Sequence, residues 1–96
     1  MKFLKISQSN CRPCAEINLF LEHNLTGQRK TITSLDQVTE SNVLYEAMAD
    51  EHPEIAAHFQ LGSVPAIIRF EDNGEVIDTT YGVDKAFLEK LVDTLN

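Results

Sequence analysis

The chain has 96 residues, of which 43% are hydrophobic, and a formal net charge of −7 from eight basic and fifteen acidic side chains. This length corresponds to one domain, residues 1–96, that can bury a core without the help of disulfides or metals. The acidic balance disfavours phosphate backbones and anionic lipid headgroups, so we expect neither a nucleic-acid partner nor a membrane surface. No segment approaches the about 20 apolar residues that cross a bilayer, and the first residues lack a leader pattern, so we expect a cytoplasmic protein and a monomer.

The first third of the chain predicts a strand, a helix and a second strand. Residues 3–6 are mostly apolar and predict the first strand. From Pro13 onward apolar side chains recur at helical spacing, and Gly27 is a good stop signal for that helix. Residues 29–35 are rich in β-branched side chains and predict the second strand.

The middle of the chain predicts two helical segments. Thr39 or Ser41 suits the N-cap of a helix. The apolar face of that helix would comprise Leu44, Ala47 and Met48. Pro53 then interrupts the helix and starts a shorter helical turn.

The last third predicts a hairpin followed by a helix. Residues 65–70 and 76–81 predict two strands, and the Asn-Gly pair within residues 72–75 suits the tight turn between them. A final helix with one apolar face begins at about Asp84. The resulting order, β-α-β-α-β-β-α, predicts an α/β fold with a four-stranded mixed sheet flanked by helices.

The only cysteines, Cys11 and Cys14, lie where the first strand passes into the first helix, in the stretch SNCRPC. In open α/β sheets sites are built at that end of a strand. A structural staple is disfavoured, because cytosolic thiols are mostly kept reduced and a bridge across two residues hardly restricts the unfolded chain. Zinc bound with His52 and His58 is disfavoured because the intervening segment far exceeds the about 12–15 residues of a zinc finger. We expect no metal, although a soft metal held by the thiols alone stays open.

The position of the pair predicts thiol chemistry. The N-terminus of a helix stabilises a nearby thiolate, and the thiolate is the form that attacks a disulfide. Cys11 would lie exposed before the helix and attack, and Cys14, one turn inside, would resolve the mixed disulfide. Pro13 suits the first helical turn and stiffens it. The charge of Arg12 would favour the Cys11 thiolate and raise the reduction potential, unless Arg12 is merely a solvated side chain.

Two separate motifs resemble thioredoxins. CRPC at the start of the first helix is similar to their pattern of two cysteines with proline before the second. Residues 52–83, HPEIAAHFQLGSVPAIIRFEDNGEVIDTTYGV, resemble their C-terminal half: a helix, a hydrophobic–proline step, a hairpin with an Asn-Gly turn, and a glycine before the last helix. The resemblance covers about two thirds of the chain. It implies one thioredoxin-like domain with the thioredoxin fold, lacking the strand and helix that precede the central strand in full thioredoxins.

The resemblance also implies how the site would be completed. The Val64–Pro65 peptide bond would be cis and pack beside the cysteines. The backbone of Val64 would pair with a bound substrate segment, and Gly82 and Val83 would line the same apolar patch.

Lys5 is a departure from the family pattern. It stands where thioredoxins bury an aspartate that is thought to shuttle protons to the second cysteine. An inward-pointing Lys5 would favour the Cys14 thiolate, but a long charged side chain also reaches solvent readily, and we expect it to do so.

These observations predict a thiol-disulfide oxidoreductase that acts on protein disulfides by dithiol exchange. It would need no bound cofactor, because the redox-active Cys11–Cys14 disulfide carries the electrons and an upstream reductase or glutathione restores the dithiol. We expect a potential above the about −270 mV of thioredoxin. One alternative is a glutathione-dependent reductase, since the short start and Ser63-Val64-Pro65 resemble glutaredoxins, although YGVD only partly matches their later motif. Another is a non-catalytic thioredoxin-fold binding module whose cysteines form a redox or metal clasp.

Overall fold

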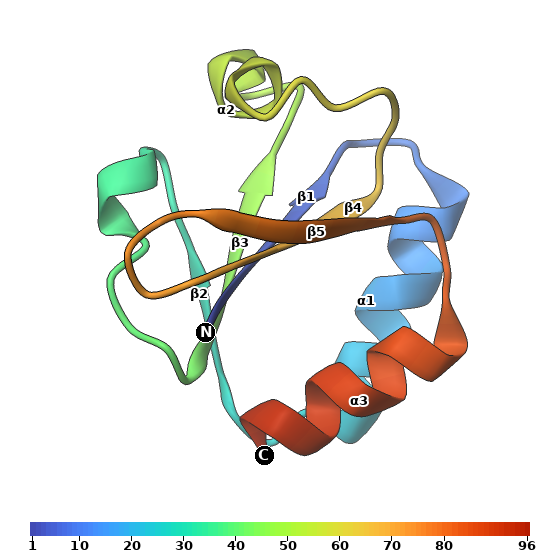
Figure 1. Cartoon of the computed structure of the whole chain (residues 1–96). Helices are drawn as coiled ribbons and strands as arrows, with labels where there is room; N and C mark the ends of the chain where they lie inside the picture. The colour runs from blue at the N-terminus through green and yellow to red at the C-terminus, as the bar shows by residue number, and fades with distance from the viewer.

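The computed structural model describes residues 1–96 as one sheet with helices on both faces (Figure 1). The elements in chain order are β1 (Lys2–Ser7), α1 (Arg12–Asn24), β2 (Gln28–Thr31), a 3₁₀ turn (Leu35–Gln37), β3 (Val43–Met48), α2 (Pro53–His58), β4 (Ala66–Phe70), β5 (Val76–Tyr81) and α3 (Lys85–Leu95). The longest helix, α1, has 13 residues, and none of the helices has the length and hydrophobicity of a membrane span.

The sheet has five strands in the order β2-β3-β1-β4-β5. The central strand β1 pairs in parallel with β3 and antiparallel with β4, β2 pairs in parallel with β3, and β4 and β5 form the predicted hairpin. The mixed α/β architecture is as predicted, but the predicted count of four strands is wrong. The additional strand comes from the segment that the sequence pattern had indicated to be helical.

The predicted helix beginning at Thr39 or Ser41 is absent, and residues 43–48 form β3 instead. The strand lies between β1 and β2 with both faces covered. Val43, Tyr45 and Ala47 enter one apolar cluster, and Leu44 enters the other. A strand buried on both faces gives a nearly continuous apolar run, which a short stretch does not distinguish from a helix face.

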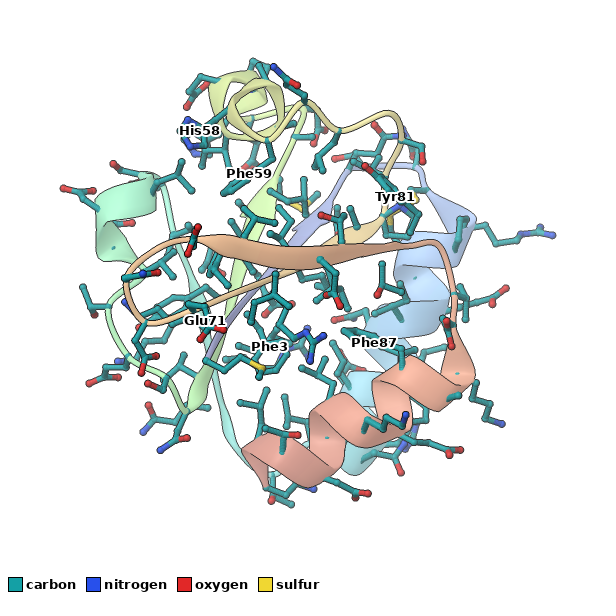
Figure 2. The ribbon with its side chains drawn as sticks, viewed as in Figure 1. Phe3, His58, Phe59, Glu71, Tyr81 and Phe87 are labelled. Carbon is teal, nitrogen blue, oxygen red and sulfur yellow. A yellow bond between two sulfur atoms is a disulfide. The ribbon has the colours of Figure 1, made fainter.

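The two faces of the sheet carry separate apolar clusters. The first, under α1 and α3, comprises Phe3, Ile17, Leu21, Leu44, Ile67, Leu88, Leu91, Val92 and Leu95. Phe3 and Phe87 lie in this layer between the sheet and α3 (Figure 2). The second cluster, under α2 and the 3₁₀ turn, comprises Leu4, Ile6, Ile32, Val43, Tyr45, Ala47, Ile55, Ile68 and Phe70.

Two loops make close contacts with neighbouring elements of the fold. The Tyr45 hydroxyl accepts hydrogen bonds from the backbone N–H groups of Thr39 (3.2 Å) and Glu40 (2.9 Å), which holds the segment before β3. Gly27, between α1 and β2, approaches the end of α3 so closely that a Cβ there would lie 2.5 Å from the Leu95 carbonyl oxygen. The close approach leaves no room for a side chain at Gly27.

Candidate active site

Cys11 and Cys14 are bonded to each other at the N-terminus of α1, with their Cα atoms 5.2 Å apart. Cys11 is the N-cap residue, and the backbone N–H of Cys14 donates a hydrogen bond to Cys11 Sγ at 3.2 Å. Cys11 is half-buried, whereas the Cys14 residue is only 6% exposed. The two sulfurs therefore differ in access: a partner can approach Cys11, and Cys14 faces the interior.

The two residues between the cysteines point outward. Arg12 and Pro13 are both exposed, Pro13 lies in the first turn of α1 as predicted, and Arg12 forms no ion pair. Asn10, directly before Cys11, has a φ of 55°, in the left-handed region that asparagine tolerates better than most residues. This turn redirects the chain from the end of the strand segment into the helix.

The Val64–Pro65 bond is cis, as the resemblance to thioredoxins implied. Pro65 is buried. Because Ala66 pairs with Ile6, Pro65 lies at the same end of the strands as the loop from β1 to Cys11. The Pro65 carbonyl accepts a hydrogen bond from the Gly82 N–H at 2.9 Å, which connects the residue after β5 to the residue before β4.

The two residues on either side of Gly82, Tyr81 and Val83, are apolar and exposed. Val83 is 45% exposed, and Tyr81, at the end of β5 (Figure 2), is 47% exposed. The resemblance pointed to Val83, and sequence reasoning missed Tyr81. The available signal was its place beside Gly82 in a strand end that precedes the last helix.

Lys5 points into the protein, and the expectation that it reaches solvent is wrong. Its side chain is 6% exposed, and its Nζ lies 2.9 Å from Oε1 of Glu46, whose side chain is 17% exposed. The two residues are register partners in the parallel pairing of β1 with β3, so the sheet itself brings them together. A buried lysine is tolerated here because a carboxylate compensates its charge.

Arg29 of β2 extends this pair into a network of three charges. Its Nη2 lies 2.6 Å from Glu46 Oε1 and its Nε 2.9 Å from Oε2, while Nη2 also donates to Asn18 Oδ1 of α1 at 2.7 Å. Burial alone would raise the pKa of Glu46, but the hydrogen bond from Arg29 and the charge of Lys5 lower it below the ordinary value. Glu46 is therefore a carboxylate at neutral pH.

The network lines a polar cavity of about 520 Å³ beneath the first turns of α1. Cys11 and Cys14 line the same cavity, as do Lys5, Arg29 and Glu46. Ser7 lines it too, and its buried Oγ has no hydrogen-bond partner within the protein. The cysteine pair thus shares this cavity with three charged side chains, whereas residues further along α1 pack in an apolar layer.

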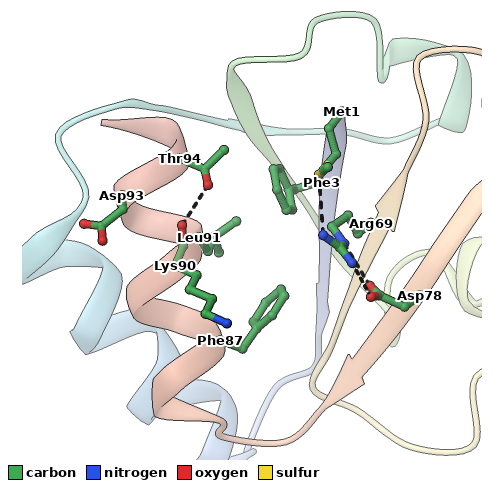
Figure 3. A pocket seen from close by; sticks show the side chains of 9 residues that line it. All are labelled: Met1, Phe3, Arg69, Asp78, Phe87, Lys90, Leu91, Asp93 and Thr94. Carbon is green, nitrogen blue, oxygen red and sulfur yellow. Dashed lines mark hydrogen bonds and ion pairs between the residues drawn. The ribbon is translucent and has the colours of Figure 1, made fainter.

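Other parts of the molecule do not add to this site. A second cavity of about 530 Å³ lies between α3 and the strands, with a charged rim that includes Arg69, Asp78 and Lys90 (Figure 3). It contains no cysteine or histidine. No group of three or more histidine, cysteine, aspartate or glutamate side chains lies together in a way that could hold a metal ion, so His52 and His58 do not join the cysteines.

Comparison with known proteins agrees with the geometry, although no protein-family model matches the chain. The SPbeta prophage-derived thioredoxin-like protein YosR of Bacillus subtilis is 27% identical over 96 residues, with 99% of each chain covered. The structure of Fasciola hepatica thioredoxin superposes with a TM-score of 0.67 at 17% identity, covering 98% of this chain and 79% of that one. Oxidized mitochondrial thioredoxin 3 of Saccharomyces cerevisiae gives 0.65 at 22% identity, covering 95% and 74%. The chain has the thioredoxin fold.

The thioredoxin-like fold and the bonded Cys11–Cys14 pair support thiol–disulfide chemistry in general terms. The chain spans 79% and 74% of the lengths of these two thioredoxins. Lys5, which the resemblance placed where thioredoxins bury an aspartate, is paired here with the Glu46 carboxylate of the neighbouring strand.

Proposed function

We propose that this protein is a thiol-disulfide oxidoreductase that acts on protein disulfides through Cys11 and Cys14. The unequal exposure of the two bonded sulfurs at the start of α1 is the observation that carries the proposal. Thiol–disulfide exchange by a dithiol needs one sulfur that a substrate can reach and a second sulfur close enough to attack the first. Cys11 has the first property, and Cys14 has the second.

The reaction divides into two exchanges. The Cys11 thiolate attacks one sulfur of the substrate disulfide, a mixed disulfide forms, and the other substrate sulfur leaves as a thiolate with the bonding electron pair. The Cys14 thiolate then attacks Cys11 Sγ, which forms the Cys11–Cys14 disulfide and releases the second substrate thiolate. Two electrons pass from the protein to the substrate, and an upstream dithiol reductase or glutathione returns them by the reverse exchanges. No bound cofactor takes part.

The surroundings of Cys11 support attack on a protein segment. The backbone at Val64, before the cis proline, would pair with the substrate chain, and Gly82 and Val83 would contact its side chains. Tyr81 extends this surface. Arg12 is exposed next to Cys11 and favours the attacking thiolate, so we expect a potential above about −270 mV.

The test is an equilibration of the purified protein in a series of glutathione redox buffers, with chelator and without oxygen, read by alkylation and intact mass. We expect one two-electron transition between the dithiol and the Cys11–Cys14 disulfide. A midpoint at or below about −270 mV would contradict the role of Arg12. Persistent glutathionylation would favour the glutathione-dependent alternative.

Two substitutions separate an enzyme from a binding module. With a disulfide-containing test protein, Cys14→Ser should accumulate a mixed disulfide at Cys11, and Cys11→Ser should accumulate none. If the partner stays bound to both variants without a covalent link, the cysteines are dispensable for the interaction and the protein is a binding module. If the native protein forms no reversible disulfide at any redox poise, dithiol exchange is excluded.

A further inference from the structure

The cavity beneath α1 is lined by Cys14 and by the charged network of Lys5, Arg29 and Glu46. These three charged side chains have no role in the dithiol exchange described above. The charged or titratable residues that line it are Cys11 at the N-cap of α1, Cys14 of α1, Lys5 of β1, Arg29 of β2 and Glu46 of β3. The three strands contribute one charge each. Two positive charges and one negative charge give this side of the cavity a net charge of +1.

The contacts within the network show which positively charged side chain has donors left for another group in the cavity. Glu46 is bound by Arg29 through both carboxylate oxygens and by Lys5 through Oε1, so neither oxygen is without a cation. The Lys5 ammonium has three N–H donors, of which the ion pair with Glu46 accounts for one. Lys5 therefore keeps donors for another group in the cavity, and Ser7 Oγ, buried and without a protein partner, lines the same space.

The protonation states of the network are also distinct. Glu46 is charged at neutral pH, and a guanidinium does not give up its proton in a protein. A carboxylate between two cations is a poor proton acceptor for a thiol, so this site does not operate through a buried acid that titrates near neutrality.

We propose that Lys5 stabilises the thiolate of Cys14 from the interior, and that Glu46 and Arg29 are positioning residues that hold Lys5 in the cavity. The proposal rests on the proposed dithiol function and assigns the network a role within it. When the internal disulfide is reduced, the attacking thiolate bonds to Cys11 and the electron pair of the broken S–S bond passes to Cys14 Sγ. Lys5 balances the negative charge that appears on that sulfur. In the resolving direction, the same charge keeps Cys14 ready to attack.

The signs of the charges give a test that a purely structural network would not pass. Lys5→Met removes a positive charge and disfavours the Cys14 thiolate. Glu46→Gln removes the negative charge, leaves two positive ones, and favours the thiolate. Both substitutions break the same ion pair, so a structural role predicts no shift or shifts in one direction, whereas the proposal predicts shifts of opposite sign.

The measurement uses Ellman's reagent with the reduced protein in stopped flow. Cys11 releases one aromatic thiolate as it forms the mixed disulfide, and Cys14 releases the second as it closes the internal disulfide. The pH midpoint of the second release reports on Cys14, and Cys14→Ser, which gives a single release, identifies that step. We expect Lys5→Met to raise this midpoint by about one pH unit and Glu46→Gln to lower it by a similar amount.

Lys30→Met is the matched control, because Lys30 is an exposed residue of β2 whose loss changes the net charge by the same amount. It should leave the midpoint unchanged. If Glu46→Gln does not fold, Lys5→Arg replaces it. This variant keeps the positive charge at position 5, so its midpoint should stay close to the native value while that of Lys5→Met rises. An unchanged midpoint in Lys5→Met, equal rises in Lys5→Met and Lys5→Arg, or shifts of the same sign in Lys5→Met and Glu46→Gln would overturn the proposal. A native protein without a second release would instead overturn the dithiol function itself.

Discussion

Glutamine at position 46 should destabilise the fold far more than methionine at position 5, although both substitutions remove one partner of the same ion pair. Glu46→Gln leaves the Lys5 ammonium, which is 6% exposed, without a counter-charge, and replaces one of the two oxygens that accept hydrogen bonds from Arg29 by an NH2 donor. Breaking a buried pair in this way costs about 3–5 kcal/mol. Because the Glu46 and Arg29 side chains are 17% and 24% exposed, we expect the lower end, about 3 kcal/mol.

Lys5→Met has a different effect on the network. The forked pair between Arg29 and Glu46 stays intact, and an apolar side chain of similar length replaces the buried ammonium. We expect a loss of about 1 kcal/mol or less, since an apolar replacement leaves no donor unsatisfied. Urea unfolding of the oxidised protein at neutral pH measures both, and a loss of about 3 kcal/mol corresponds to a midpoint shift of about 1–3 M. Equal losses, or a larger loss in Lys5→Met, would refute the view that Glu46 is the centre of the network.

Three further predictions concern stability. The pKa of Glu46 is lowered in the folded protein, so its contribution to stability is present above the ordinary pKa of 4.5 and is lost as the pH falls through the folded value. Below about pH 5 the unfolding free energy of Glu46→Gln should therefore depend less on pH than that of the native protein. Gly27→Ala should lower the unfolding free energy by about 1–3 kcal/mol, because its Cβ would meet the Leu95 carbonyl, whereas Gly62→Ala, with open space around it, should leave the melting temperature nearly unchanged. Tyr45→Phe should cost about 1–3 kcal/mol in chemical unfolding, since two backbone N–H groups lose their acceptor, and an unchanged midpoint would show that the loop rearranges to satisfy them.

The parts of the fold that the sequence predicted well are those with local signals. The strand at residues 3–6, the helix after Pro13, the Asn-Gly hairpin and the amphipathic last helix each follow from a periodicity or a turn residue within a few positions. The cis bond before Pro65 is different, because only the resemblance to thioredoxins indicated it. The cysteine pair, in contrast, has a local signal, because the helix start that gives the pair its predicted chemistry lies within the same six residues.

The errors concern β3 and Lys5, and they have one cause. Taking residues 43–48 as a helix removed the strand that pairs with β1, and with it the register that places Glu46 opposite Lys5. Without a visible partner, solvent was the reasonable expectation for a lysine. Arg29 comes from a third strand, so the network depends on three segments whose pairing no local pattern in one sequence reveals.

Arg29 lies on β2, a strand of four residues at the outer edge of the sheet that pairs on one side only. Edge segments open locally at a much smaller free energy than the core. Each opening of β2 would withdraw Arg29 from Glu46 and change the charge balance beneath Cys14 without unfolding the domain. The amide hydrogen-exchange rates of residues 28–31 would therefore report on the charge balance of the cavity that Arg29 shares with Cys14.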